Sequence, residues 1–406
     1  MFIRNMQTKT RLKLELATYG TGIDDQEGLS FSVPITYKPV ANTPSLEKAY
    51  AHSTHWSSRL SAPRLPIAMV GVVFDNVTLT EALARLTAMV ASRQPHYVVT
   101  ANVDFLVRAR RDAELRRILL DAHLVLCDGT PLVWASRLLG NPLPERVAGS
   151  DLVPHLLELA ARQDHRLFFL GASPEANAQA ITNVRKQLPG INIVGGYSPP
   201  FRGLGDLDHA EICRRIRTAR PDIVLVAFGC PKAEKWMAMN YRSLGVPLMI
   251  GVGGTLDFLA GRLKRAPLWM QRAGLEWAFR LAQEPRRLAG RYASDLLHFG
   301  WALAAQWWWL KLCSAYVFLR EDKALVIDTV RRGQVLGADD ESASRGVNLS
   351  RVEAIDSTGV AALLRLRRQA SLDGHELTVL NPSRAVQRAF RLMRVQSLFQ
   401  IAGGTT

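Results

Sequence analysis

An aspartate follows a short apolar segment at the point where a buried strand would end. Asp128 and Gly129 come directly after the apolar residues 124–127. A carboxylate at the carboxyl end of a parallel strand can act as a general base that removes the proton of an attacking hydroxyl group. An aspartate in an Asp-Gly turn can instead accept hydrogen bonds from the first amide groups of the next helix. Both interpretations of Asp128 stay open at this point.

Further polar and glycine residues follow apolar segments in the same way. They are Thr100 and Asn102, Gly171 and Ser173, and the turns at 229–231 and 251–254. Where a helix begins at such a turn, its free backbone N–H groups can bind a phosphate. Each turn taken alone is also explained as a tight connection between a strand and a helix. The chain has neither the dinucleotide-binding glycine pattern nor the Walker pattern, so a nucleotide-sugar oxidoreductase is disfavoured and no ATPase site is indicated.

The strands and helices that must position these residues are indicated by a repeating pattern of apolar segments over residues 66–260. Short apolar segments recur, and each stops at or beside a glycine, aspartate or asparagine: 67–74, 96–102, 123–129, 166–172, 191–197, 222–229 and 246–254. Strands that alternate with helical patterns are typical of a mostly parallel sheet. The sequence therefore predicts an α/β domain with a Rossmann-like sheet. We expect the candidate residues to gather at one edge, where the carboxyl ends of the strands meet.

The chain is strongly basic, and part of that charge is concentrated. Its 406 residues carry a net charge of +15, and 48% of them are hydrophobic, which excludes a disordered or fibrous protein. The excess indicates a negatively charged partner: nucleic acid, an anionic membrane surface or a phosphate-bearing substrate. Residues 262–291 hold eight basic and two acidic residues, and a tryptophan-rich stretch follows.

We interpret residues 261–320 as a basic, tryptophan-rich helical appendage that lies next to an anionic membrane. The alternative is a charged helix face beside ordinary core aromatics. Nucleic acid is not expected as a partner, because no nucleic-acid-binding motif accompanies the charge.

The remaining features limit where the protein works. Residues 1–65 show no sustained periodicity and are expected to form a mobile leader without a signal-peptide core. The four cysteines include no Cys-x-x-Cys pair, which argues against a zinc ribbon and a disulfide scaffold and fits a reducing cytoplasm. The stretch 299–319 comes closest to a membrane span, but Gln306 and Lys311 interrupt it.

Eight motifs that occur in order carry a resemblance to a known family. They are VTANVDFL (99–106), CDGTPLVWASRLLG (127–140), ERVAGSDL (145–152), FFLGASPE (168–175), GGYSPPF (195–201), FGCPKAEKW (228–236), GVGGTLDFLAGRLKRAP (251–267) and GLEWAFRLAQEPRR (274–287). With this order and spacing, about residues 66–292 resemble the WecG/TagA/CpsF glycosyltransferases.

The resemblance implies an inverting hexosyltransferase that needs neither a metal nor another cofactor. Its donor would be a UDP-sugar, and its acceptor an undecaprenyl-diphosphate-linked saccharide, a polyprenyl-diphosphate-linked sugar of exopolysaccharide or surface glycan biosynthesis. The enzyme would be peripheral, at the cytoplasmic face of the inner membrane. The resemblance also suggests self-association into a homo-oligomer.

The resemblance also assigns roles to residues of this chain. Asp128 matches the general base, Thr100 and Asn102 match an active-site Thr-x-Asn, and Arg146 matches an active-site arginine. Arg280 and Arg287 match arginines of an appendage that closes over the site and meets the lipid diphosphate. The other candidates for substrate binding are the turn residues Gly171, Ser173, Tyr197, Gly229, Pro231, Glu234 and Gly253.

One position departs from the family pattern. The family reads Pro-x-Gln-Glu where this chain has Pro231, Lys232, Ala233 and Glu234. Loss of the glutamine removes a hydrogen-bond donor worth about 1–3 kcal/mol, unless Lys232 or a different substrate compensates. This departure motivates an alternative function: a catalytically weakened transferase fold that serves as a scaffold or regulator of polysaccharide assembly.

The last part of the chain, 321–406, resembles a small α/β STAS domain through the segments 347–366 and 374–386. The resemblance implies a protein partner or a kinase, with Ser357 as the phosphorylation candidate and Thr358 beside it. A phosphate at that helix N-terminus would change partner binding electrostatically. The alternative is that Asp356 and Ser357 simply cap the helix.

Overall fold

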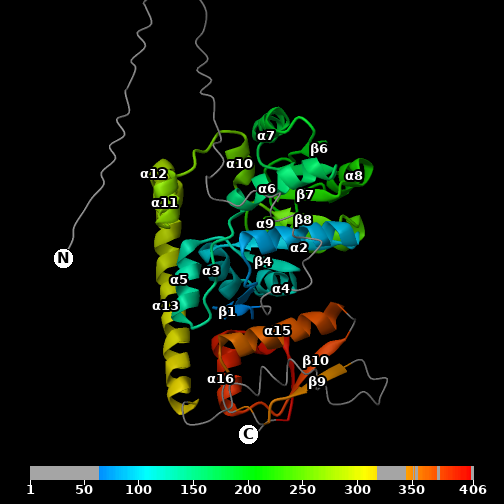
Figure 1. Ribbon diagram of the computed structural model, residues 1–406. Coiled ribbons are helices and arrows are strands. Elements are labelled where there is room, and N and C mark those ends of the chain that lie inside the picture. Colours follow the sequence, from blue (N-terminus) through cyan, green and yellow to red (C-terminus); the bar gives the residue numbers. More distant parts are fainter. Residues whose placement is uncertain (1–63, 318–343, 351, 353–354, 373–374, 404–406) are drawn as a thin grey trace, which may run out of the picture. The chain divides into compact units, whose positions relative to one another are not determined.

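The computed structural model describes residues 64–317, 344–350, 352, 355–372 and 375–403 (Figure 1). Almost all of the expected leader, 1–65, and the first part of the expected STAS-like domain lie outside the described residues.

The larger sheet has six parallel strands in the order β4-β3-β8-β7-β5-β6. Their bounds are β3 His96–Ala101, β4 Leu124–Cys127, β5 Leu167–Gly171, β6 Ile193–Tyr197, β7 Ile223–Ala227 and β8 Leu248–Gly251. The strands are almost wholly apolar because helices cover both faces of the sheet. In β3, Tyr97 and Val99 belong to one core cluster while Val98 belongs to the other, as the two-residue period of a strand requires.

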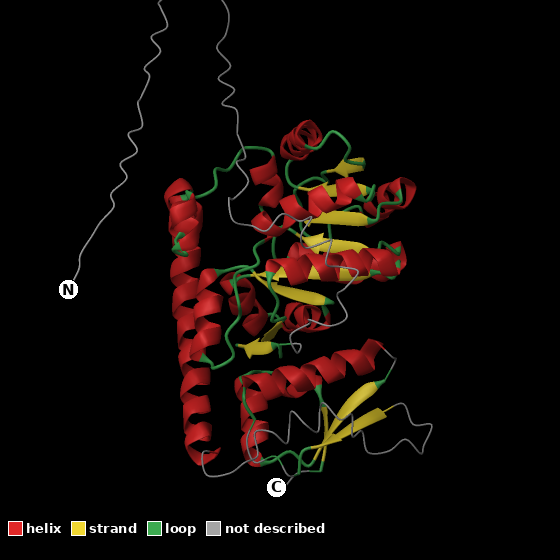
Figure 2. Ribbon diagram, viewed as in Figure 1, coloured by secondary structure: helices red, strands yellow, loops and turns green. Residues whose placement is uncertain are grey.

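Two layers of helices enclose this sheet (Figure 2). One core cluster contains side chains of α3 Val103–Arg111, α4 Ala113–Asp121, α5 Thr130–Leu138, α8 His209–Ala219 and α9 Lys232–Leu244. The other contains side chains of α2 Leu79–Ser92, α6 Gly149–Arg162, α7 Pro174–Gln187 and α10 Thr255–Leu259. The predicted α/β architecture with a mostly parallel sheet is confirmed.

The first apolar segment, 67–74, is a hairpin rather than one strand. Its strands β1 Ile67–Met69 and β2 Val72–Phe74 pair antiparallel with each other. The turn between them places Val70 at φ +51° and Gly71 at φ +89°. Two consecutive left-handed residues allow the tight reversal that matches the twist of the two strands.

Three helices follow the sheet: α11 Leu268–Arg272, α12 Glu276–Gln283 and α13 Pro285–Val317. The predicted helical appendage is therefore present through residue 317. Helix α13 runs along α3 and also contacts α16. None of the helices within the described residues is both long and apolar enough to cross a membrane.

The C-terminal region is a second, smaller α/β unit with the parallel strand order β11-β10-β9. Its elements are β9 Ser344–Asn348, α15 Ser357–Leu372, β10 Glu376–Leu380, α16 Arg384–Leu392, the 3-10 turn η2 Gln396–Leu398 and β11 Gln400–Ala402. Its core includes Ala68 of β1 and Leu120 of α4. The hairpin and α4 therefore form the surface on which this unit packs.

Candidate active site

Thr100 joins the ends of two neighbouring strands. Its hydroxyl donates a hydrogen bond of 3.0 Å to the backbone carbonyl of Gly251, which links β3 to β8. Gly149 at the start of α6 lies so close that an added Cβ atom would be 3.5 Å from the Thr100 hydroxyl. Because Thr100 is 6% exposed and its proton is already donated, it positions the strand ends.

Asn102 begins helix α3 beside the Asp128 turn. Its side-chain oxygen accepts a 3.0 Å hydrogen bond from the Asp104 amide and so caps the helix. The Asn102 Cβ atom would lie 3.8 Å from a Cβ atom added at Gly129. The side-chain NH2 group of Asn102 has no hydrogen-bond partner among the described residues, so it can donate to a substrate at this edge.

Asp128 does not cap the helix that follows it. The N-cap residue of α5 is Gly129, with no side-chain hydrogen bond to the helix. The Asp128 backbone is held by a 2.9 Å hydrogen bond from its N–H to the Ala101 carbonyl, while its carboxylate accepts none within the described part of the chain. Burial raises the pKa of Asp128 to about 6, although Arg146 and Arg280 act in the opposite direction. Such a carboxyl group can take up a proton near neutral pH.

Arg146 is held by two carboxylates. Its guanidinium lies 2.5 Å from Glu276 of α12 and 2.7 Å from Asp151 of α6. Arg265 pairs with the same Asp151 at 2.6 Å. Arg146 therefore ties the appendage to the sheet edge, and its positive charge also acts on Asp128. Glu276, Asp151 and Arg265 were not predicted as members of this network, although all three lie inside the eight motifs that carry the family resemblance.

Arg280 is the arginine of the appendage that reaches the strand ends. Its guanidinium lies 5.0 Å from the centre of the Phe258 ring and 3.4 Å from where a Cβ atom of Gly254 would be. It forms no ion pair with any carboxylate of the described chain, so its charge is available for an anion. Arg287 differs: its side chain is 65% exposed and pairs with Glu284 at 2.5 Å.

The turns after β5 and β6 are explained by local packing. Gly171 has φ +99°, and an added Cβ atom would lie 2.7 Å from the Ala227 carbonyl oxygen. Ser173 caps α7 and also accepts a 3.1 Å hydrogen bond from Arg262. The ring of Tyr197 lies 4.2 Å from the guanidinium carbon of Arg215. These residues share the carboxyl edge of the sheet with Asp128, but they belong to strands on the other side of β8 and β7.

Glu234 is a buried carboxyl group below the same edge. It follows the turn of Gly229 and Pro231 and is 3% exposed, and its Oε2 atom has no hydrogen-bond partner within the described residues. Burial raises the pKa of Glu234 to about 7. Its Oε1 atom would lie 3.0 Å from a Cβ atom at Gly251, so it supports the end of β8 from beneath.

Comparison with known proteins identifies the family. The family model described as "Glycosyl transferase WecG/TagA/CpsF family" matches residues 67–312, more than half of the chain. The chain belongs to this family. A second model, described as "Mlab, STAS domain", matches residues 332–400.

Curated relatives of this WecG/TagA/CpsF glycosyltransferase share one printed name. A protein of Bacillus spizizenii is 34% identical over 215 residues, which cover 53% of this chain and 82% of the relative. A protein of Staphylococcus aureus strain MW2 is 29% identical over 230 residues, or 56% of this chain and 88% of the relative. Both are named N-acetylglucosaminyldiphosphoundecaprenol N-acetyl-beta-D-mannosaminyltransferase.

The position at which this transferase departs from the family pattern lies in the core. Ala233 is 1% exposed and belongs to the same cluster as Trp236 and Met237. Lys232 donates a 2.8 Å hydrogen bond to the Arg202 carbonyl and lies 5.1 Å from the centre of the Phe228 ring. Lys232 thus contacts the 199–203 loop, and within the described residues it forms no hydrogen bond with Asp128.

The described part of the transferase contains no group of three or more His, Cys, Asp or Glu side chains placed to hold a metal ion. The sequence has an Asp-x-Asp pair at Asp206 and Asp208. Asp208 caps α8 by accepting a 2.9 Å hydrogen bond from the Glu211 amide, which gives it a structural task.

The phosphorylation candidate of the STAS-like unit is covered in this structure. Ser357 is 1% exposed, and its hydroxyl accepts a 2.8 Å hydrogen bond from the Gln306 side chain of α13. Asp356 caps α15 through a 2.8 Å hydrogen bond from the Gly359 amide. Thr358 accepts a 3.1 Å hydrogen bond from Asn141. A kinase could therefore reach Ser357 only after α15 separates from α13.

Proposed function

We propose that this chain transfers a sugar from a UDP-sugar to a hydroxyl group of an undecaprenyl-diphosphate-linked saccharide, with inversion and with Asp128 as the general base. One observation carries the proposal: the Asp128 carboxylate stands at the carboxyl edge of the sheet without a hydrogen-bond partner in the described chain, and its pKa is raised to about 6. The printed names of the relatives support a lipid-diphosphate acceptor. We further propose that the product is a lipid-linked precursor of a surface glycan and that it is made at the cytoplasmic face of the membrane.

The reaction needs a single in-line displacement. The Asp128 carboxylate takes the proton of the acceptor hydroxyl, whose oxygen forms the new bond to the anomeric carbon of the donor sugar. The bond between that carbon and the UDP oxygen breaks, and UDP leaves with the electron pair. We assign the stabilisation of that negative charge to the unpaired guanidinium of Arg280 and to the backbone N–H groups of Gly253 and Gly254. No step of this route requires a metal.

Arg146 is a positioning residue in this scheme. Its two carboxylate partners hold α12 against the sheet, and this contact brings Arg280 over the 251–254 turn. The same arginine lowers the pKa of Asp128 against the effect of burial. We infer that Arg146 keeps the base ionised at neutral pH and the appendage closed.

A stripe on α13 supports peripheral binding to an anionic membrane. Leu297, Trp301 and Trp308 are 71%, 77% and 63% exposed, and their spacing of four and seven residues puts them on one helix face. The exposed residues Arg286 and Lys311 extend the same face at its two ends. Apolar side chains flanked by basic ones suit the interface of an anionic bilayer.

The opposite face of α13 is buried through Asp295, Phe299, Ala302 and Gln306. The helix is thus fixed to the protein along one side, and the stripe of Leu297, Trp301 and Trp308 lies on the other.

The proposed function is tested with purified protein, a panel of UDP-sugars and N-acetylglucosaminyl-diphosphoundecaprenol as acceptor. Transfer is followed by mass spectrometry of the lipid product, and the configuration at the new bond by NMR. We expect transfer from one donor class with inversion at the anomeric carbon. Retention would overturn the single-displacement mechanism.

The scaffold function remains the second candidate because Ala233 replaces the family glutamine. Under that alternative, no UDP-sugar gives a product, although the protein still binds a donor in a thermal-shift measurement.

A further inference from the structure

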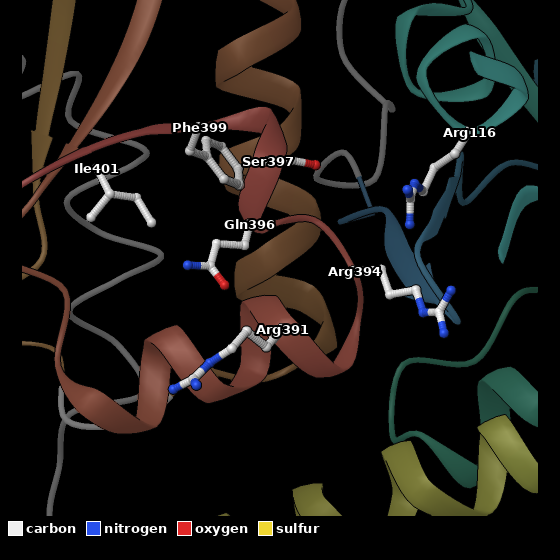
Figure 3. Close-up of a pocket in the computed structure, with 7 residues that line it drawn as sticks. All are labelled: Arg116, Arg391, Arg394, Gln396, Ser397, Phe399 and Ile401. Carbon is white, nitrogen blue, oxygen red and sulfur yellow. The ribbon is translucent and has the colours of Figure 1, made fainter. Parts of the chain in front are cut away.

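A cavity of about 620 Å³ lies where the C-terminal unit meets α4 (Figure 3). Arg116 of α4 contributes from one side, and Arg391 of α16 and Arg394 from the other. Gln396 and Ser397 of the η2 turn add hydrogen-bonding groups. The cavity is open to solvent, and its volume falls in the range of clefts that bind small molecules.

The arginines around this cavity lack carboxylate partners. Within the described residues, neither Arg116, Arg391 nor Arg394 forms an ion pair with an aspartate or glutamate. Arg394 donates a 2.5 Å hydrogen bond to the backbone carbonyl of Arg110, and the Nη1 atom of Arg116 is buried without a partner. Arg116 is partly buried, whereas Arg391 and Arg394 are exposed. Two other partly buried arginines, Arg146 and Arg367, each pair with a carboxylate.

The positive charges also act on one another. Burial lowers the pKa of Arg116, and the neighbouring Arg394 lowers it further. Arg110 has a lowered pKa from burial and from both Arg394 and Arg116. Like charges that gather on a partly desolvated wall destabilise the folded state unless an anion joins them.

We propose that this cavity binds a phosphate-bearing ligand. Guanidinium groups match phosphate oxygens with paired hydrogen bonds, and Gln396 and Ser397 supply further donors. Phe399 and Ile401 form an apolar wall beside the arginines, which suits a phosphate attached to an organic group. The ligand is either a soluble phosphorylated metabolite or the headgroup of an anionic lipid.

The position of the cavity gives its ligand a structural effect. One wall belongs to α4 of the transferase and the other to the C-terminal unit, so a bound anion bridges the two. The ligand therefore strengthens the contact between them by an amount that grows with the logarithm of its free concentration above the Kd. Neither Asp128 nor Arg280 lines this cavity, so the inference does not depend on the proposed function.

The direct test is a titration of the full chain with pyrophosphate, with AMP and with phosphatidylglycerol vesicles, by calorimetry and vesicle sedimentation. We expect binding of at least one probe, and at least tenfold weaker binding in Arg391→Gln and in Arg116→Gln. The matched control is Arg388→Gln, which removes the same charge from a position of α16 that does not line the cavity. A second variant, Arg280→Gln, keeps the affinity unchanged if the active site is not responsible, because Arg280 does not line the cavity.

Two outcomes would overturn the proposal. In the first, neither the soluble probes nor the vesicles bind. In the second, Arg388→Gln weakens binding as much as Arg391→Gln, so that net charge alone is at work. Vesicle binding that depends on Arg391, without binding of pyrophosphate or AMP, supports the proposal and identifies a lipid headgroup.

Discussion

The side-chain amide of Gln306 donates a hydrogen bond of 2.8 Å to the hydroxyl of Ser357. The same amide group donates to the Ala68 carbonyl at 2.9 Å, and the Gln306 oxygen accepts from the Val70 amide at 2.8 Å. One buried glutamine thus joins the long helix of the transferase, its N-terminal hairpin and the first residue of α15. In the sequence, Gln306 is merely the residue that interrupts a tryptophan-rich stretch.

This contact predicts how the C-terminal unit responds to charge at Ser357. Ser357→Asp places a carboxylate at a site that is 1% exposed, whereas Ser357→Ala removes only one hydrogen bond. We expect Ser357→Asp to lower the free energy of unfolding by about 2 kcal/mol more than Ser357→Ala. Urea denaturation measures the difference. The control Ser350→Asp, at an exposed position, should change it little; equal effects at the two serines would contradict the buried contact.

The hairpin tip offers a separate test of the packing between the units. Gly71 has φ +89°, and an added Cβ atom would lie 2.5 Å from the Met393 carbonyl oxygen. Gly140 has a similar φ of +81° but nothing within 4 Å. Both alanine variants pay about 1–2 kcal/mol for the left-handed backbone. We expect Gly71→Ala to lose about 1–3 kcal/mol more than Gly140→Ala in thermal or urea unfolding. Equal losses would mean that the tip is not packed against α16.

The fold was largely predictable, because its signal is local. Each strand is a short apolar segment in the sequence. Neighbouring residues such as Val98 and Val99 point to opposite faces of the sheet, and both are buried because helices cover both faces. The hairpin turn was missed because Val70 and Gly71 lack the usual Asn-Gly or Asp-Gly signature. The positions of Asp128 and Asn102 at the edge of the sheet were predictable, because each residue directly follows its strand. The partners of Arg146 were not, since Glu276 lies 130 residues away in the chain and no spacing rule joins them.

The membrane proposal predicts that exposed tryptophans of α13 bind lipid. Trp301→Ser combined with Trp308→Ser should reduce sedimentation with phosphatidylglycerol vesicles at least tenfold, because each exposed indole then no longer enters the interface. Trp134→Ser is the matched control, since Trp134 is 50% exposed but lies on α5. Added salt should weaken vesicle binding further, because it screens the attraction between the anionic lipid and the exposed charges of Arg286 and Lys311. A double variant that sediments like the wild type would contradict the membrane-binding stripe.

The raised pKa of Asp128 predicts a pH dependence of catalysis. The base works only when ionised, and burial raises its pKa to about 6. Activity should therefore fall as the pH drops through about 6 and reach a plateau above it. Measurement of kcat/KM against pH shows this fall in activity on the acidic side. Glu234, with a pKa of about 7, is the alternative titrating group. If the acidic fall disappears in Glu234→Gln, the titration belongs to Glu234 and not to Asp128.

The most direct test of the central claim is the single-turnover rate of sugar transfer by the wild type and by Asp128→Asn, with donor and lipid acceptor both saturating. Removal of a general base predicts a rate about 10²–10⁴ times lower with unchanged donor affinity. Asp206→Asn, a change of the same kind at an exposed aspartate, should keep the wild-type rate. A variant at position 128 that transfers sugar as fast as the wild type would contradict the account.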